Sequence, residues 1–253
     1  MRPLWKWMIE IIRADWLATE RVQAFTTTRS GGVSEDCYQS LNLASHVNDN
    51  PAHVERNRQR LRQQLNLPAD PLWLNQTHST QVICADNPLT LDGDAAFSRQ
   101  ANTVCTVLTA DCLPVLIANK AGDCVAAAHA GWRGLLAGVI ENTINAMAQN
   151  PDELMVWIGP AISAQVFEVG ADVRQAFMDA MPDGEQAFEQ TDESHWLADM
   201  VKLARLKLQR KGIDDVYGGD YCSYQNAQQF FSYRRDGETG RMGSFIWVKG
   251  IEN

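Results

Sequence analysis

Residues 103–134 read TVCTVLTADCLPVLIANKAGDCVAAAHAGWRG and contain the clearest structural pattern in this chain. Three short apolar runs, at residues 103–109, 113–118 and 124–130, are separated by polar turns. Such runs are typical of consecutive buried strands. Gly131-Trp132-Arg133-Gly134 then breaks the pattern, and apolar residues follow at helical spacing as far as Met147. This stretch therefore predicts buried strands, a glycine turn and a helix.

The sequence on either side continues the mixture of strands and helices. Asn50-Pro51 is typical of a helix start and Gly212 of a helix end. Runs of strands with helices inserted favour an α/β fold with mixed sheets covered by helices. The predicted strands are residues 22–28, 72–75, 80–85, 154–158, 230–233 and 244–248, and the further helices are residues 51–67, 171–180 and 196–211.

Length and composition limit the class of protein. The chain has 253 residues, of which 45% are hydrophobic, enough to bury a core without disulfides or oligomer contacts. No linker or repeat marks a boundary, so we expect one domain over residues 1–253, with residues 1–20 as an N-terminal extension, and a monomer. The net charge of −9 argues against nucleic acid or an anionic membrane as partner, but it permits a small anionic substrate.

The N-terminal sequence and the cysteines indicate the compartment. Glu10, Arg13 and Asp15 interrupt the apolar residues near the start, so neither a signal peptide nor a spanning segment is expected there. The six cysteines form no CxxC pair, which is typical of reduced thiols that are mostly buried and inert. We expect a cytoplasmic protein.

Two histidines and one cysteine are the candidate ligands of a metal ion. His78 and His129 each follow a predicted strand or lie at its end, and Cys112 lies between two apolar runs beside Asp111. Functional groups are commonly displayed at such positions. Two imidazoles and a thiolate leave a fourth position free, the pattern of catalytic zinc, and the same set suits copper. The alternative for Cys112 is a buried, inert thiol.

Other residues are candidates for binding an anion or a planar base. Arg133 opens the helix after His129, where free N–H groups favour an anion, and Arg29 begins a second glycine-rich loop. Tyr233 and Arg234 lie in an aromatic and basic segment that could stack on a base. The alternatives are an ordinary turn with solvated arginines and a surface hairpin. Asp94, Asp111 and Glu168 are the acid and base candidates.

Seven ordered blocks together resemble the YfiH family, also called the laccase-domain or purine nucleoside phosphorylase family. The resemblance covers the chain from about Thr26 to Val248. Asn42 and Gln76 lie in these blocks, and we add them to the predicted substrate-binding residues. The blocks are Thr27-Thr28-Arg29-Ser30-Gly31-Gly32-Val33-Ser34, Ser40-Leu41-Asn42-Leu43, Gln76-Thr77-His78, Thr109-Ala110-Asp111-Cys112-Leu113-Pro114-Val115, Ala128-His129-Ala130-Gly131-Trp132-Arg133-Gly134, Gly159-Pro160-Ala161-Ile162 and Phe230-Phe231-Ser232-Tyr233-Arg234-Arg235.

The resemblance implies a four-layer α/β/β/α fold and a metal bound by His78, Cys112 and His129. Family members are described as purine nucleoside phosphorylases acting on adenosine, inosine and methylthioadenosine, and as adenosine deaminases. Others are described as copper-dependent polyphenol oxidases or as editors of peptidoglycan precursors. The resemblance thus implies an enzyme, but it leaves several reactions open.

The leading hypothesis is a zinc- or copper-dependent purine nucleoside phosphorylase that also deaminates adenosine. Arg29 and Arg133 are expected to hold the phosphate. Deamination needs a metal-activated water and a carboxylate to carry protons, for which Asp94 or Asp111 is the candidate. The usual HxE…PCxxC signature of zinc deaminases is absent from the sequence, so a deaminase site in this chain would use a different set of residues.

Three alternatives remain. A copper polyphenol oxidase is the first, although five histidines without an HxH pair do not supply the multi-copper cluster of ordinary laccases. The second is a metal-free cysteine hydrolase acting on a peptidoglycan precursor, with Cys112 as nucleophile and His129 as base. A non-catalytic binding module is the third, and it predicts no turnover of nucleosides or phenols.

Overall fold

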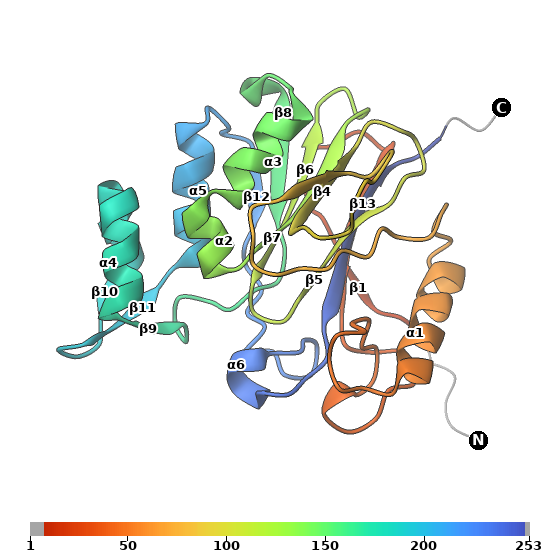
Figure 1. Cartoon of the computed structure of the whole chain (residues 1–253), viewed down its shortest axis with the longest axis horizontal. Helices are drawn as coiled ribbons and strands as arrows, with labels where there is room; N and C mark the ends of the chain where they lie inside the picture. Colours follow the sequence, from red (N-terminus) through yellow and green to blue (C-terminus); the bar gives the residue numbers. More distant parts are fainter. Residues whose placement is uncertain (1–7, 251–253) are drawn as a thin grey trace.

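Two β-sheets packed face to face form the centre of the computed structural model, which describes residues 8–250 (Figure 1). The larger sheet contains, in spatial order, β12 (Val216–Gly218), β8 (Leu154–Ile158), β6 (Leu113–Asn119), β7 (Val125–Ala130), β4 (Ala95–Ser98) and β3 (Val82–Cys84). It is mixed, because the β12–β8 and β3–β4 pairs are parallel and the other pairs are antiparallel. The second sheet, fully antiparallel, contains β1 (Ile11–Arg13), β2 (Val22–Thr27), β13 (Met242–Val248) and β5 (Cys105–Thr109).

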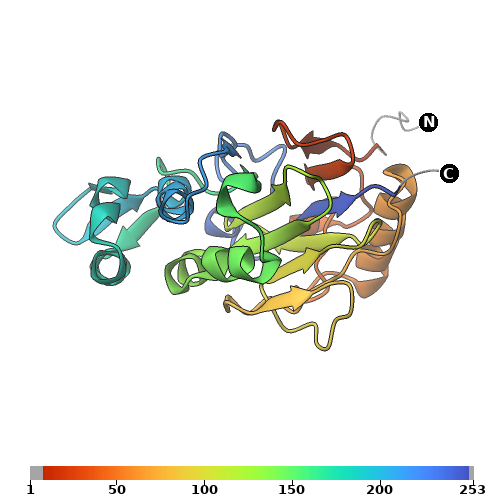
Figure 2. The ribbon, with the colours of Figure 1, turned by 90° about the horizontal axis from the view of Figure 1, so that it is seen from above.

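Helices cover the outer faces of both sheets. Figure 2 shows α2 (Trp132–Ala137), α3 (Val139–Met147) and α5 (Met200–Arg210) beside the six-stranded sheet, and α1 (Pro51–Gln64) beside the other sheet. Apolar side chains of α3 and α5, such as Ile140 and Leu203, are buried against the first sheet, and Leu61 of α1 is buried against the second. The expected α/β/β/α layers are therefore confirmed.

The inner faces of the two sheets share a third apolar cluster. Val107 of β5 and Ile246 of β13 meet Leu116 of β6 and Ala127 of β7, all fully buried. Because every second residue of a strand faces the same side, each strand supplies this core with one set of side chains and the helix-covered face with the other. Strands buried on both faces read as the nearly continuous apolar runs seen in residues 103–130.

A smaller antiparallel sheet, β10-β11-β9, lies beyond α5 (Figures 1 and 2). It contains β9 (Glu168–Gly170), β10 (Phe188–Gln190) and β11 (His195–Ala198). In the sequence, α4 (Ala171–Ala180) connects β9 to β10. Phe177 of α4 joins the same apolar cluster as Leu203 of α5, so this unit is continuous with the helical layer. Single 3₁₀ turns occupy Asp36–Tyr38, Pro151–Glu153 and Pro182–Ala187.

Most predicted elements are confirmed, but four differ from the prediction. Residues 196–198 are strand and not helix, because Asp199 caps Lys202 N and the helix begins only at Met200. Residues 72–75 form only isolated bridges. Residues 230–233 are not a strand: Phe230 and Phe231 are both buried in one apolar cluster, and the single-turn helix α6 (Tyr233–Asp236) follows. The helix predicted from residue 135 is divided at Gly138, whose φ is +100°.

The predicted N-terminal extension contributes to the fold. Residues 11–13 form the edge strand β1, and Asp15 accepts a hydrogen bond from Trp157 Nε1 at 2.8 Å. Residues 1–7 of the extension lie outside the described residues. Among residues 8–250, no helix combines the length and the apolar character that crossing a membrane requires.

Candidate metal centre

Strand pairing brings His78, Cys112 and His129 together at one end of the six-stranded sheet. Cys112 directly precedes β6, and β6 pairs with β7 in the register Pro114↔His129, so the thiol and the imidazole lie at the same end. His78 comes from the segment before β3. Its Nε2 lies 3.8 Å from the Cys112 Sγ, and its ring centroid lies 4.8 Å from that of His129. One ligand atom from each of the three residues lies within 4.8 Å of the other two.

Asp94 holds two of these three residues in place. Its carboxylate, fully buried just before β4, accepts a hydrogen bond from His129 Nδ1 at 2.8 Å. It also accepts from the backbone N–H groups of Thr77, His78 and Ser79, and from Ser79 Oγ. Burial opposes the ionisation of Asp94, but the hydrogen bonds from His129 and Ser79 outweigh it and lower its pKa to about 2. A permanently charged Asp94 therefore fixes both His129 and the segment that carries His78.

The thiol and the imidazole stabilise each other's charged forms. Burial raises the pKa of Cys112, but the charge of His129 and hydrogen bonds from both histidines lower it to about 6. Burial lowers the pKa of His129, but the charge of Cys112 and the bond to Asp94 raise it to about 9. Without a metal, the pair is therefore a thiolate and an imidazolium at neutral pH.

The donor set and the space between the donors fit a metal ion. Because Asp94 takes Nδ1 of His129, Nε2 is left to bind a metal, as is typical of carboxylate–histidine–metal arrangements. Tetrahedral zinc places a thiolate sulfur and an imidazole nitrogen roughly 3.6 Å apart, near the observed 3.8 Å. A Cβ on Gly131 would lie 2.7 Å from His78 Cδ2 and 2.9 Å from Cys112 Sγ, so only glycine leaves the three ligands this room.

Positive φ angles occur on both sides of the site. His78 has φ +61° and Asp111, which precedes Cys112, has φ +90°. Non-glycine residues rarely adopt this conformation, and it persists where surrounding contacts impose it. For His78 the contact is the hydrogen bond of its own N–H to Asp94. The carboxylate of Asp111 accepts from Ser223 Oγ and from Arg234 N, each at 2.6 Å. Asp111 therefore ties the 221–236 segment to the site.

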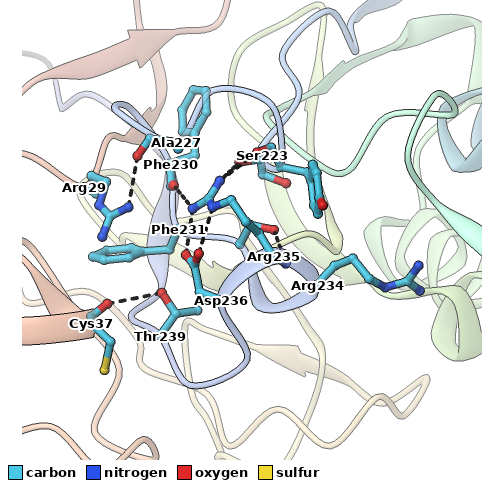
Figure 3. Close-up of polar contacts among 12 residues, drawn as sticks. Arg29, Cys37, Ser223, Ala227, Phe230, Phe231, Arg234, Arg235, Asp236 and Thr239 are labelled. Carbon is cyan, nitrogen blue, oxygen red and sulfur yellow. Dashed lines mark hydrogen bonds and ion pairs between the residues drawn. The ribbon is translucent and has the colours of Figure 1, made fainter.

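The other predicted substrate residues have different surroundings. The side chains of Asn42 and Gln76 are already hydrogen-bonded to other residues. Asn42 bonds the side chain of Asp49 and the backbones of Ala44 and Arg241. Gln76 bonds both backbone groups of Leu108. Arg29 donates to the carbonyls of Gln39 and Ala227 and lies over Phe231 (Figure 3).

Three predicted residues are exposed. Arg133 lies over the ring of Trp132, and Arg234 donates to the Glu168 carbonyl. Tyr233 is 61% exposed and has the guanidinium of Arg241 5.8 Å from its ring centroid. Of these three residues, Tyr233 has free aromatic surface, and it lies in the 221–236 segment that Asp111 holds.

His46 and Arg241 are two further groups near the site, outside the predicted metal ligands. The charge of Arg241 interacts with Cys112 and Asp111, and the charge of His46 interacts with Arg241 and His129. Burial lowers the pKa of Arg241 and, together with nearby positive charges, that of His46. His46 and Arg241 come from distant parts of the chain, and hydrogen bonds between residues 42–43 and 241 hold these parts together. Arg241 N donates to Asn42 Oδ1, and Leu43 N donates to the Arg241 carbonyl. No local sequence pattern indicates this arrangement.

Comparisons with known proteins identify the family of this chain. The family model described as "Multi-copper polyphenol oxidoreductase laccase" matches residues 23–249. The purine nucleoside phosphorylase YfiH of Escherichia coli K12 is 49% identical over 243 residues, 95% of this chain and all of that protein. A purine nucleoside phosphorylase of Pseudomonas aeruginosa is 46% identical over 93% of this chain and 97% of its own length.

Solved structures show the same fold. A Neisseria meningitidis protein superposes with a TM-score of 0.92 at 52% identity, covering 95% of this chain and 99% of its own. YlmD from Geobacillus stearothermophilus gives a TM-score of 0.86 at 27% identity, covering 91% and 93%. The chain therefore belongs to the YfiH family, the enzyme family whose model is described as a multi-copper polyphenol oxidoreductase laccase.

Proposed function

We propose that the chain is a cytoplasmic, metal-dependent purine nucleoside phosphorylase with adenosine deaminase activity. Its substrates would be adenosine, inosine and methylthioadenosine, cleaved by phosphate to the free base and ribose 1-phosphate. One observation carries the proposal: three metal donors converge at one end of the six-stranded sheet, in a chain 49% identical to a purine nucleoside phosphorylase. The free thiols of all six cysteines support the compartment.

The metal is proposed to be zinc or copper, held by His78, Cys112 and His129. When bound, it supplies a Lewis acid that polarises an oxygen of the substrate or of water. His78 lies on the exposed side of the triad and His129 on the buried side, so substrate would approach past His78. Tyr233 would stack on the purine, since its ring offers free aromatic surface.

For Asp94 we propose a positioning role in place of the proton transfer suggested by the sequence. Both of its oxygens already accept hydrogen bonds, and a pKa of about 2 makes it a poor proton carrier at neutral pH. For Asp111 the proposal is similar, because its oxygens hold Ser223 and Arg234. The proton donor to the leaving base would then be solvent or a substrate group.

Two other activities have support from particular observations. The description of the matching family model favours polyphenol oxidation, for which a single ion at this site would have to be copper. The thiolate–imidazolium pair of Cys112 and His129 favours a cysteine hydrolase acting on a peptidoglycan precursor. Loss of His78 separates these readings, because it removes a metal ligand but leaves the Cys112–His129 pair intact.

The test is product analysis with metal-quantified protein. Inosine or adenosine is incubated with and without phosphate, with Cys112→Ala protein as control. The proposal expects phosphate-dependent hypoxanthine or adenine that the variant does not form, and phosphate-independent inosine from adenosine. If neither base nor inosine forms, the proposal fails, and phenol oxidation with copper is tested next.

A further inference from the structure

Phosphorolysis needs a place for an oxyanion near the metal, and few cationic groups remain to provide it. The guanidinium of Arg29 is bonded to the carbonyls of Gln39 and Ala227, the second of which is drawn in Figure 3. Arg235 is also fully engaged, since it donates to the carbonyls of Ser223, Tyr224 and Phe230 and pairs with Asp236. Within residues 8–250, Arg29 keeps only Nη2 without a hydrogen-bond partner, and Arg235 keeps none of its three nitrogens free.

Arg241 differs from both. Its Nη1 donates to the carbonyls of Thr239 at 2.7 Å and Gly240 at 3.0 Å, which fixes the plane of the guanidinium. Within residues 8–250, its Nε and Nη2 have no hydrogen-bond partner. The side chain is half-buried, and its charge interacts with Cys112. A fixed cation with unused donors therefore lies close enough to Cys112 for their charges to interact.

The backbone around Arg241 is held firmly. Its N–H donates to Asn42 Oδ1, its carbonyl accepts from Leu43 N, and the next residue, Met242, pairs with Thr109 three residues before Cys112. The 42–46 segment, which these bonds hold beside Arg241, carries His46. Neither ring nitrogen of His46 bonds to another residue in the described part of the chain. Two groups with free donors thus lie together beside the triad.

We propose that Arg241, assisted by His46, binds the tetrahedral oxyanion that takes part in the reaction, namely inorganic phosphate. A guanidinium with two free donors matches the spacing of two phosphate oxygens. His46 contributes one ring N–H, since positive neighbours favour its neutral form. The guanidinium carbon of Arg241 lies 5.8 Å from the centroid of the Tyr233 ring, so a base stacked on Tyr233 would lie near the bound phosphate. The choice of inorganic phosphate rests on the proposed function.

The test compares Arg241→Gln with Arg241→Lys and a matched control, Arg99→Gln. Arg99 also donates to two backbone carbonyls, of Ala146 and Met147, and lies over an aromatic ring, Phe97, but at the end of β4 opposite Asp94. Phosphate binding to metal-loaded protein is measured by the rise in melting temperature with phosphate concentration, and phosphorolysis of inosine gives the KM for phosphate.

We expect Arg241→Gln to weaken phosphate binding and raise this KM about ten- to hundredfold, with a smaller change in the KM for inosine. Arg241→Lys should recover part of the binding, and Arg99→Gln should match the wild type. Unchanged phosphate binding in Arg241→Gln overturns the inference, as does a fall in kcat alone. So does Arg241-dependent binding of inosine 5′-monophosphate without binding of inorganic phosphate, which would make the group a nucleotide-phosphate site. If wild-type protein binds phosphate through Arg241 but releases no base, the oxyanion site stands and the proposed function fails.

Discussion

Nδ1 of His129 donates to the Asp94 carboxylate at 2.8 Å, while that same carboxylate accepts the backbone N–H groups on either side of His78 and that of His78 itself. One buried anion thus sets the ring orientation of one metal ligand and the backbone of another. Strand pairing makes this possible. Antiparallel β4 and β7 pair with Ala95 opposite Ala128, so Asp94, just before Ala95, lies opposite His129, just after Ala128. Asp94 and His129 are therefore placed side by side by the sheet itself.

Asp94→Asn should weaken metal binding about 10- to 100-fold, because the amide cannot accept from both His129 and the 77–79 backbone. Competition with a chromogenic chelator measures the affinity. Asp86→Asn is the matched control, since Asp86 accepts hydrogen bonds from Ser98 and Arg99 at the other end of β4. Equal loss of metal in both variants would show a general effect on the sheet, contrary to the positioning role.

Gly131→Ala should abolish tight metal binding while the chain still folds. The added methyl would lie within 2.9 Å of both His78 and Cys112, closer than carbon atoms pack. Metal content after purification, with circular dichroism to check folding, measures this. Gly237→Ala serves as the control, because its Cβ would meet no atom within 4 Å although its φ is +68°. A Gly131→Ala protein with one firmly bound ion would contradict the cramped geometry.

Cys112 in metal-depleted protein should be alkylated as a thiolate well below pH 9. Its pKa of about 6 lies below the ordinary thiol value, so the thiolate fraction, and with it the rate, rises as the pH increases through about 6. Peptide mass spectrometry after iodoacetamide treatment at several pH values gives the rate for each cysteine. Cys124, whose pKa burial raises to about 11, is the internal reference and should stay unreactive. A rate midpoint near pH 9 for Cys112 would refute the ion pair.

Asp111→Gly should destabilise the protein by about 2–4 kcal/mol, since it removes the acceptor of two short hydrogen bonds, from Ser223 and Arg234. Glycine adopts φ +90° without strain, so the variant introduces no new backbone strain, and the relief of the strain at Asp111 makes the measured loss a lower bound. Urea unfolding measures the loss. We also expect a raised KM for inosine but normal metal content, because the segment carrying Tyr233 loosens while the triad remains. Lost metal would instead place Asp111 among the supports of the ligands.

Local features predicted the central strands and pointed to His78 and His129, whereas the resemblance to the YfiH family was needed to single out Cys112 as the third candidate ligand. The runs around Leu113–Asn119 are apolar on both faces, as strands between two layers must be, and His129 ends such a run. The role of Asp94 could not be predicted, since its partner lies 35 residues away and is chosen by β4–β7 pairing. The same holds for Arg241 and His46, whose neighbours come from distant segments.

The errors in secondary structure also have local causes. Leu197 fits the apolar face of a helix through residues 196–211, but the Asp199 cap makes the helix begin at Met200. The consecutive aromatic residues Phe230 and Phe231 have high strand propensity, yet both are buried in one cluster where a strand would expose one of them. A local helix cap decides the first place, and tertiary packing overrides propensity at the second.

We propose that phosphorolysis depends on one metal ion bound by His78, Cys112 and His129. The most direct measurement is hypoxanthine released from inosine and phosphate by metal-depleted protein as zinc or copper is added back in measured steps. We predict that the rate rises to a plateau at one ion per chain in the wild type and does not rise in His78→Ala protein. A rate that is unaffected by depletion, or that survives fully in His78→Ala, would contradict the claim.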